Sequence, residues 1–199
     1  SAEAVEKEDG ENRGEIIIVY EHGFVPQKQQ IKIPLPLYRG IVMTSFPIYG
    51  SDKGPGQNLE VLADGQTLGQ TAVICDVRAL AIKSLYEQLP GIIFREITRV
   101  IAKTMTQKAA SDNAGIFGSI AVSVYKVATS NADLRAWYTL PNDVQIMRAF
   151  LPAGDIPLTL QRAGNALPMQ MTVNVESGKQ TVIRVVDVGT SCFADAYTF

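Results

Sequence analysis

The stretch that decides the fold runs from Asp76 to Pro141 and reads DVRALAIKSLYEQLPGIIFREITRVIAKTMTQKAASDNAGIFGSIAVSVYKVATSNADLRAWYTLP. It is the only long part of the chain with helical periodicity, and strand-like sequence lies on both sides of it. Asp76 fits a helix N-cap, because a short carboxylate accepts hydrogen bonds from the free N–H groups of a first turn. Apolar residues then recur at helical spacing as far as Leu89. We therefore expect a first helix that begins directly after Asp76.

Two breaks divide this stretch. Pro90-Gly91 is expected to end the first helix, because proline cannot donate to the helical ladder and glycine relaxes the backbone. A second helix is expected over about residues 92–108, followed by a polar break at 109–114. Residues 115–129 are almost uncharged and apolar at helical spacing, which favours a third helix, while their β-branched side chains leave a strand open. This segment is too short and too polar to span a membrane, which takes ~20 mostly apolar residues.

Strand-like sequence flanks the helical stretch. Residues 16–20 form a continuous apolar run, and residues 30–37 alternate but carry two prolines, which indicates an edge strand or an extended segment. The strand candidates after Pro141 are residues 144–150, 156–160, 169–175 and 181–186. Short strands with close turns are typical of a small antiparallel sandwich. The predicted fold is α+β, a mainly antiparallel, sandwich-like β core with an inserted group of two to three helices over about residues 76–130.

The chain length suits one sizeable core. With 199 residues, of which 46% are hydrophobic, we expect residues 14–199 to form a single domain with a helical insert at 76–131. Residues 1–13 are acidic and polar, and we interpret them as a flexible lead-in or the end of an upstream domain. A net charge of -2 gives no general attraction to nucleic acid, so no nucleic-acid partner is expected.

The cysteine and histidine content limits the chemistry. Cys75 and Cys192 cannot make a disulfide framework; one bridge is possible in an oxidising compartment, and two buried free thiols are the simpler interpretation. His22 is the only histidine and no cysteine pair has ligand spacing, so neither a metal site nor a cofactor is expected. The sequence also lacks a Gly-x-Ser-x-Gly nucleophile motif and a Gly-rich phosphate loop, which argues against an enzyme.

Three groups of residues are candidate functional sites. Arg95, Arg99 and Lys103 recur every four residues on one helix face, where like charges cost a few tenths of a kcal/mol per pair (about 0.2–0.5 kcal/mol). Their charge predicts either a solvated face paired with acidic neighbours or a site for an anion or an acidic partner.

The second and third groups lie outside the basic face. Asp133, Arg135 and Trp137 alternate and would share one side of an extended segment, either as a structural corner that Trp137 seals or as a recognition patch. His22 and Lys28 lie near a Gly/Pro loop and are loop candidates, although surface positions without a role are the simpler interpretation.

The chain resembles two kinds of known protein. Residues 141–186 resemble the small β-sandwich modules of bacterial surface proteins through a Val-x-Val-x-x-Gly-x-x-Thr-Val-x-x-Val hairpin. The residues of that hairpin pattern are Val173, Val175, Gly178, Thr181, Val182 and Val185.

The second resemblance covers most of the chain and rests on four patterns in a fixed order. They are Gly14-Glu15 before an apolar strand, Gly23-x-x-Pro26-x-Lys28, Arg95-x-x-x-Arg99-x-x-x-Lys103, and Ala132-Asp133-x-Arg135-x-Trp137-x-x-Leu140-Pro141. This order resembles the C-terminal region of an uncharacterised family of bacterial envelope lipoproteins, whose N-terminal half is a tetratricopeptide-like helical array. The resemblance implies a periplasmic or outer-membrane location, a lipid anchor upstream of Ser1 as the only membrane association, and an envelope protein partner. It implies no reaction.

The function expected from these observations is a non-enzymatic binding or assembly module of a cell-envelope lipoprotein, which presents a sheet edge or a helix face to a protein partner. The alternative is a carrier of a lipid or small amphiphile, with residues 115–129 lining the cavity and Arg95 and Arg99 holding the anionic head. A third hypothesis is a hydrolase with an unrecognised carboxylate or Cys75 site.

Overall fold

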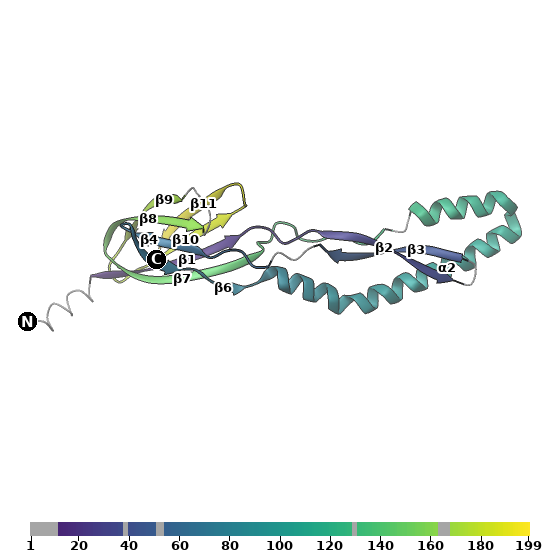
Figure 1. Cartoon of the computed structure of the whole chain (residues 1–199), viewed down its shortest axis with the longest axis horizontal. Helices are drawn as coiled ribbons and strands as arrows, with labels where there is room; N and C mark the ends of the chain where they lie inside the picture. Colours follow the sequence, from purple (N-terminus) through teal and green to yellow (C-terminus); the bar gives the residue numbers. More distant parts are fainter. Residues whose placement is uncertain (1–11, 38–39, 51–53, 129–130, 163–167) are drawn as a thin grey trace, which may run out of the picture. The chain divides into compact units, whose positions relative to one another are not determined.

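A computed structural model describes residues 12–37, 40–50, 54–128, 131–162 and 168–199, without the side chains of 35, 37, 40, 103, 104 and 106–128. Most of the expected lead-in, residues 1–11, lies outside the described part, and Arg13 already begins the first strand. Figure 1 shows the elements in chain order: β1 (Arg13–His22), β2 (Lys28–Leu37), β3 (Gly40–Tyr49), β4 (Leu59–Ala63), β5 (Gln66–Gln70), β6 (Ala72–Cys75), α2 (Val77–Ala128), β7 (Asp143–Pro152), β8 (Gly154–Arg162), β9 (Met169–Val175), β10 (Gln180–Asp187) and β11 (Cys192–Thr198).

The chain divides into two compact units, each built from segments distant in sequence. Unit 1 draws on residues 1–25, 53–79 and 139–199, and unit 2 on residues 26–52 and 80–138. Most of the helical stretch expected as an insert therefore belongs to unit 2, together with β2 and β3.

Unit 1 contains two sheets that share one hydrophobic core. The five-stranded sheet has the order β11-β10-β1-β7-β6, and the four-stranded sheet has the order β5-β4-β8-β9. Alternate residues of each strand enter the core, as the period of two in a strand requires. The core residues are Ile16, Ile18, Tyr20, Leu59, Val61, Ala63, Met147, Leu151, Ile156, Leu158, Leu160, Val173, Val175, Ile183 and Val185. The strands before and after the helical stretch thus form a common core, as predicted.

β1 occupies the centre of the five-stranded sheet. It runs parallel to β10, with Ile18 opposite Ile183, and antiparallel to β7, with Ile18 opposite Met147. The described strands form three sheets, of which this one is mixed and the other two are antiparallel, so the predicted α+β class is confirmed. The C-terminal strand β11, which pairs with β10, was not predicted, because its residues show no alternation of apolar and polar types.

In unit 2, β2 and β3 form a two-stranded antiparallel sheet. Pro34 and Pro36 lie in β2 opposite Met43 and Ile41. Alternate residues of a strand direct their N–H groups to the same side, so both prolines fit positions whose N–H would face away from β3. The predicted edge character of residues 30–37 is confirmed.

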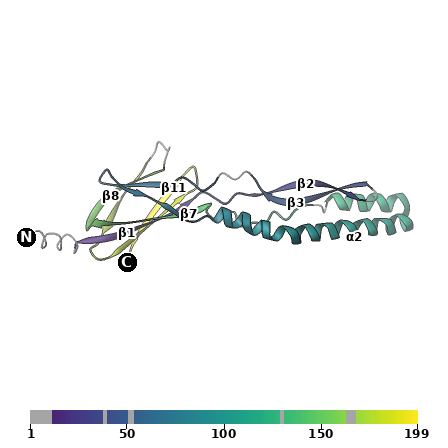
Figure 2. The same cartoon turned by 60° about the horizontal axis from the view of Figure 1, so that its bottom comes forward.

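The prediction of two to three helices is wrong, because the described residues contain one long helix. α2 is helical from Val77 to Ala128, through Pro90-Gly91 and through the expected polar break at 109–114, although its ribbon turns back in its second half (Figures 1 and 2). Its predicted N-cap is correct, since the Ala79 amide donates to Asp76 Oδ1 at 2.8 Å.

Packing explains why α2 continues past Pro90. A proline inside a helix removes one backbone hydrogen bond and costs roughly 3 kcal/mol. Leu85, before it, and Val100, after it, are both buried. Burying a leucine or valine side chain contributes about 1.5–3 kcal/mol, so tertiary contacts on both sides offset the loss.

Replacing Pro90 by alanine tests this continuity. The new N–H can donate to the Tyr86 carbonyl one turn earlier, so the free energy of unfolding should rise by about 1–3 kcal/mol in urea titrations followed by helical circular dichroism. Gly91→Ala is a matched control: a Cβ there meets no atom within 4 Å, so a rise of about 0.5–1 kcal/mol is expected. A Pro90→Ala protein that is no more stable than wild type would indicate that the helix ends at Pro90.

Candidate functional site

Unit 2 contains a half-open cavity of about 490 Å³, which we call the α2 groove. Its walls come from β2, β3, α2 and the segment 131–133. The lining residues are Lys28, Ser45, Pro47, Leu85, Glu87, Gln88, Gly91, Ile92, Arg95, Glu96, Arg99, Asn131, Ala132 and Asp133. Polar and charged side chains predominate, with Pro47, Leu85 and Ile92 as the larger apolar contributors.

The α2 groove brings together residues from all three predicted groups. Arg95 and Arg99 come from the basic helix face, Lys28 from the loop candidates, and Asp133 from the alternating segment. The side chain of Lys103 lies outside the described residues, so its place relative to the groove stays a prediction.

The remaining two members of the alternating segment do not line the groove. Arg135 binds Asp133 through Nε at 3.0 Å and through a terminal nitrogen at 2.8 Å. Trp137 is 74% exposed, so it does not seal a core. Asp133 therefore orients Arg135 as expected, whereas the sealing role that we considered for Trp137 is wrong.

Most charges in the α2 groove are paired within the chain. Arg99 contacts Glu96 at 2.7 Å, and Glu87 contacts the exposed Lys83 at 3.8 Å. Arg135 holds the pKa of Asp133 far below its usual range through its side-chain and backbone N–H groups, with a smaller contribution from the charge of Lys28. Asp133 is consequently ionised throughout the physiological range.

Two cations in the groove remain without a carboxylate ion pair. Arg95 forms no ion pair within the described part of the chain, and the Lys28 ammonium donates only to the neutral Arg135 carbonyl, at 3.2 Å. Within the described residues, internal pairing therefore leaves these two positive charges in the groove without an ion pair.

A second surface of α2 is apolar, and we call it the α2 stripe. It consists of exposed side chains that recur at helical spacing: Tyr86, Ile93, Phe94, Ile97, Ile101 and Met105. Phe94 is 74% exposed and Met105 is 69% exposed. The stripe and the groove have no residue in common, because they use different faces of the helix.

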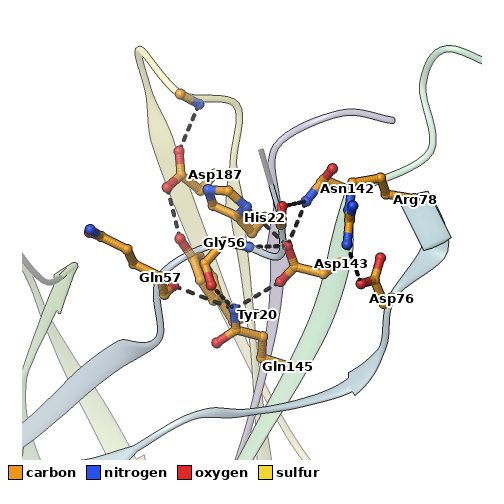
Figure 3. Close-up of polar contacts among 12 residues, drawn as sticks. Tyr20, His22, Gly56, Gln57, Asp76, Arg78, Asn142, Asp143, Gln145 and Asp187 are labelled. Atoms are coloured by element: carbon orange, nitrogen blue, oxygen red, sulfur yellow. Dashed lines mark hydrogen bonds and ion pairs between the residues drawn. The ribbon is translucent and has the colours of Figure 1, made fainter. Parts of the chain in front are cut away.

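Unit 1 contains a buried polar cluster at the ends of β1 and β7, shown in Figure 3. The Asp143 carboxylate is fully buried. It accepts from the Gly56 backbone N–H at 2.7 Å, from the Asn142 side-chain amide at 2.9 Å and from the Gln145 side-chain amide at 2.8 Å. His22 Nδ1 lies 3.2 Å from the same carboxylate. These hydrogen bonds keep the pKa of Asp143 below its usual value, although burial alone would raise it.

Backbone hydrogen bonds also connect the chain segments that meet at this cluster. The Asn142 amide donates to the His22 carbonyl at 2.9 Å, and the Arg78 amide donates to the Asn142 carbonyl at 3.0 Å. The Val25 amide donates to the Leu140 carbonyl at 3.0 Å. The cluster therefore lies where the chain leaves unit 1 and where it returns to it.

A neighbouring group is centred on Asp187 (Figure 3). Its carboxylate accepts from the Tyr20 hydroxyl at 2.8 Å, from Arg162 at 2.6 Å and from the Gly189 amide at 2.7 Å. Burial, followed by the hydrogen bond to Asp187, raises the pKa of Tyr20. Tyr20 therefore remains protonated and acts as a buried donor.

The described contacts of His22 are its hydrogen bond to Asp143 and its ring contact with Tyr20. Both cysteines are free and neither is buried, since Cys75 is half-buried and Cys192 is exposed, so the interpretation as two buried thiols is wrong. Although Cys192 is exposed as a whole, partial burial of its thiol group and the charge of Asp187 raise the pKa of that thiol, which opposes a reactive thiolate.

Sequence reasoning singled out His22 but missed Asp143, Gln145, Arg162 and Asp187. For Asp143 and Gln145, the alternation along the strand was a usable signal. Both lie on the same side of β7 as the core residue Met147, so two polar residues occupy inward positions of a strand. Inward polar residues require partners, and this predicts a buried hydrogen-bonded cluster.

Comparison with known protein families, with curated proteins and with solved structures finds no match to this chain. The described residues hold no group of three or more His, Cys, Asp or Glu side chains that could bind a metal ion. Within the same residues, no helix combines the length and apolar character needed to cross a membrane.

Replacing Asp143 by asparagine tests the cluster. The amide keeps the shape of the carboxylate but loses its charge and faces the donors with an NH₂ group, so the free energy of unfolding at neutral pH should fall by about 2–4 kcal/mol. Because the folded-state pKa of Asp143 lies below its unfolded value of about 3.9, its stabilisation is complete above that pH and is lost as pH falls through the folded pKa. The difference between the two proteins should therefore shrink in acid.

The matched control is Asp64→Asn. Asp64 is exposed at a turn with φ of 47°, a conformation that asparagine tolerates, so a change below about 0.5 kcal/mol is expected. Denaturant titrations between neutral pH and the acid limit give both values. A stability difference for Asp143→Asn that is negligible, or that stays constant down to the lowest pH, would contradict the proposed anchoring role.

Proposed function

We propose that this chain is a non-enzymatic binding module of a bacterial cell-envelope lipoprotein, and that it presents the α2 stripe to a helix of a protein partner. The observation that carries the proposal is the continuity of the stripe. Single exposed apolar side chains are common on soluble proteins, whereas contiguous apolar surfaces mark interaction sites. From Tyr86 to Met105 the stripe extends about 28 Å along the helix, at 1.5 Å per residue.

The form of the stripe favours a helix as its partner. Ile93, Ile97, Ile101 and Met105 are each four residues apart, which gives a ridge that fits between the side-chain rows of another helix. Thr98 lies beside the ridge, and its hydroxyl donates to the Phe94 carbonyl at 2.8 Å, so its methyl group extends the apolar surface. Thr98 and Ala102 are small and exposed, which allows close approach of a second backbone.

The sheet edge of unit 2 is a poorer candidate surface. A partner strand would have to pair with an edge of the β2–β3 sheet, and two prolines in β2 remove donors from that edge. We therefore place the protein partner on the helix face rather than on this edge.

The proposed location rests on the resemblance of the ordered sequence patterns to those of envelope lipoproteins. By that resemblance, we propose that the module is periplasmic or at the outer membrane.

The two other hypotheses gain no support. The side chains of residues 115–129, which the carrier hypothesis expects to line an apolar cavity, lie outside the described residues. The α2 groove, which contains Arg95 and Arg99, is half-open and lined mainly by polar side chains. The hydrolase hypothesis places its site on a carboxylate or on Cys75. The carboxylates of Asp143 and Asp187 are each held by several hydrogen bonds, and Cys75 is a half-buried free thiol, so no described group is favoured for this role.

Site-specific photo-crosslinking in the bacterial envelope tests the proposal. A photoreactive residue in place of Phe94 should give a discrete adduct with one envelope protein, whereas the same residue in place of Phe193, an exposed aromatic of unit 1, should not. Against that purified protein, the double variant Ile97→Ser/Ile101→Ser should bind about 100-fold more weakly, since each lost contact costs about 1–2 kcal/mol.

Circular dichroism of the double variant verifies its helix content. An adduct formed only from the Phe193 position, or unchanged affinity of the double variant, would overturn the assignment of the stripe as the interface.

A further inference from the structure

We propose that the α2 groove is a second, separate binding site, and that it takes a small ligand with a carboxylate or phosphate group held between Lys28 and Arg95. The inference does not depend on the protein partner, because no residue of the groove belongs to the α2 stripe.

The charge balance of the groove points to an anion. Three lining cations face three lining carboxylates, Glu87, Glu96 and Asp133. Each carboxylate already has its own cation, since Glu96 pairs with Arg99, Glu87 with Lys83 and Asp133 with Arg135. Lys83 and Arg135 do not line the groove, so they neutralise two of its acids from outside. Among the described residues, Arg95 has no carboxylate partner, and Lys28 acts on Asp133 only through a weak charge interaction, so both cations can bind a ligand.

The two cations come from different walls. Lys28 is the first residue of β2, and its ammonium is held by the Arg135 carbonyl, which leaves further N–H donors. Arg95 belongs to α2, and its planar guanidinium can donate two parallel hydrogen bonds to one oxyanion. An anion between them would receive charge-assisted hydrogen bonds from both walls of the groove.

Space for the rest of the ligand is provided by Gly91. Gly91 lies one helical turn before Arg95, and a Cβ at this position would meet no atom within 4 Å. Leu85, Ile92 and Pro47 supply apolar surface beside it. The cavity volume of about 490 Å³ lies within the usual range for small-molecule sites, roughly 300–1,000 Å³.

Titration with inorganic phosphate and with succinate, each followed by calorimetry and by backbone amide NMR at low ionic strength, tests the site and separates the two anion types. At least one probe should bind in the millimolar range and shift the amide signals of Gly91 and Ala132. The probe that binds more tightly assigns the anionic group as phosphate or carboxylate.

Three variants locate the binding. Arg95→Gln and Lys28→Gln should each weaken it about tenfold, the loss expected for a charge-assisted hydrogen bond of about 1.4 kcal/mol. Gly91→Leu should abolish it by filling the open space, without strain in the helix. Lys32→Gln is the matched control. Lys32 is exposed on the same strand as Lys28 but does not line the groove, so losing its charge should change the affinity less than about twofold.

The outcomes decide the proposal. Failure of both probes to bind, equal loss of affinity in Lys32→Gln and Arg95→Gln, or full binding by Gly91→Leu would each overturn it. Arg95→Gln gives the decisive result if Gly91→Leu does not fold, because Arg95 is exposed and makes no ion pair within the described residues.

Discussion

The fold depends on the burial of β1 in the centre of unit 1. Ile16, Ile18 and Tyr20 are each 0% exposed, and they pack in one core with side chains from both sheets. β1 also provides the backbone that joins the two ends of the chain, since it pairs with β10 on one side and with β7 on the other. Burying three such side chains contributes about 1.5–3 kcal/mol each, and the pairing partners of β1 depend on the same contacts.

The polar cluster fixes the chain at the end of β1, where the chain passes between the units. His22 ends β1, Asp143 begins β7, and Gly56 precedes β4. All three meet at one buried carboxylate. A Cβ on Gly56 would come within 2.0 Å of His22 Nδ1, so the close approach of this loop requires glycine. The hydrogen bonds of the cluster therefore join these connections at one point.

The proposed binding surfaces, in contrast, lie in unit 2 on side chains that the cores do not use. The α2 stripe is exposed, and the cations of the α2 groove line an open cavity. Side chains of this kind can change with small effects on stability, because exposed groups contribute little to folding.

The sequence predicts the parts of this fold that are set by local pattern. Alternation of apolar and polar residues predicts strands. The short carboxylate of Asp76 predicts where α2 begins, and the prolines of β2 predict that this strand lies at a sheet edge. Local signals fail where distant contacts decide: Pro90-Gly91 reads as a break, but burial on both sides keeps the helix intact. The parallel pairing of β1 with β10 is equally hidden, because nothing near either strand specifies a partner more than 150 residues away.

The candidate site shows the same limit. Lys28, Arg95 and Asp133 are individually conspicuous as charged residues near structural breaks. Their meeting in one groove requires β2, α2 and the segment after α2 to be neighbours, and no spacing in the sequence encodes that. The exposed face of α2 was equally hidden, since apolar residues surround most of its circumference and the sequence alone does not show which side is buried.

Native-state hydrogen exchange tests the common core most directly. If β1 and β10 belong to one cooperative core, the amides of Ile18 and Ile183 exchange only on global unfolding, with free energies that agree within about 0.5 kcal/mol. Ile18→Val should then lower both values by the same amount, about 1 kcal/mol. Exchange of the Ile183 amide at a much lower free energy, unaffected by Ile18→Val, would show that the two strands belong to separately unfolding bodies and would contradict a common core.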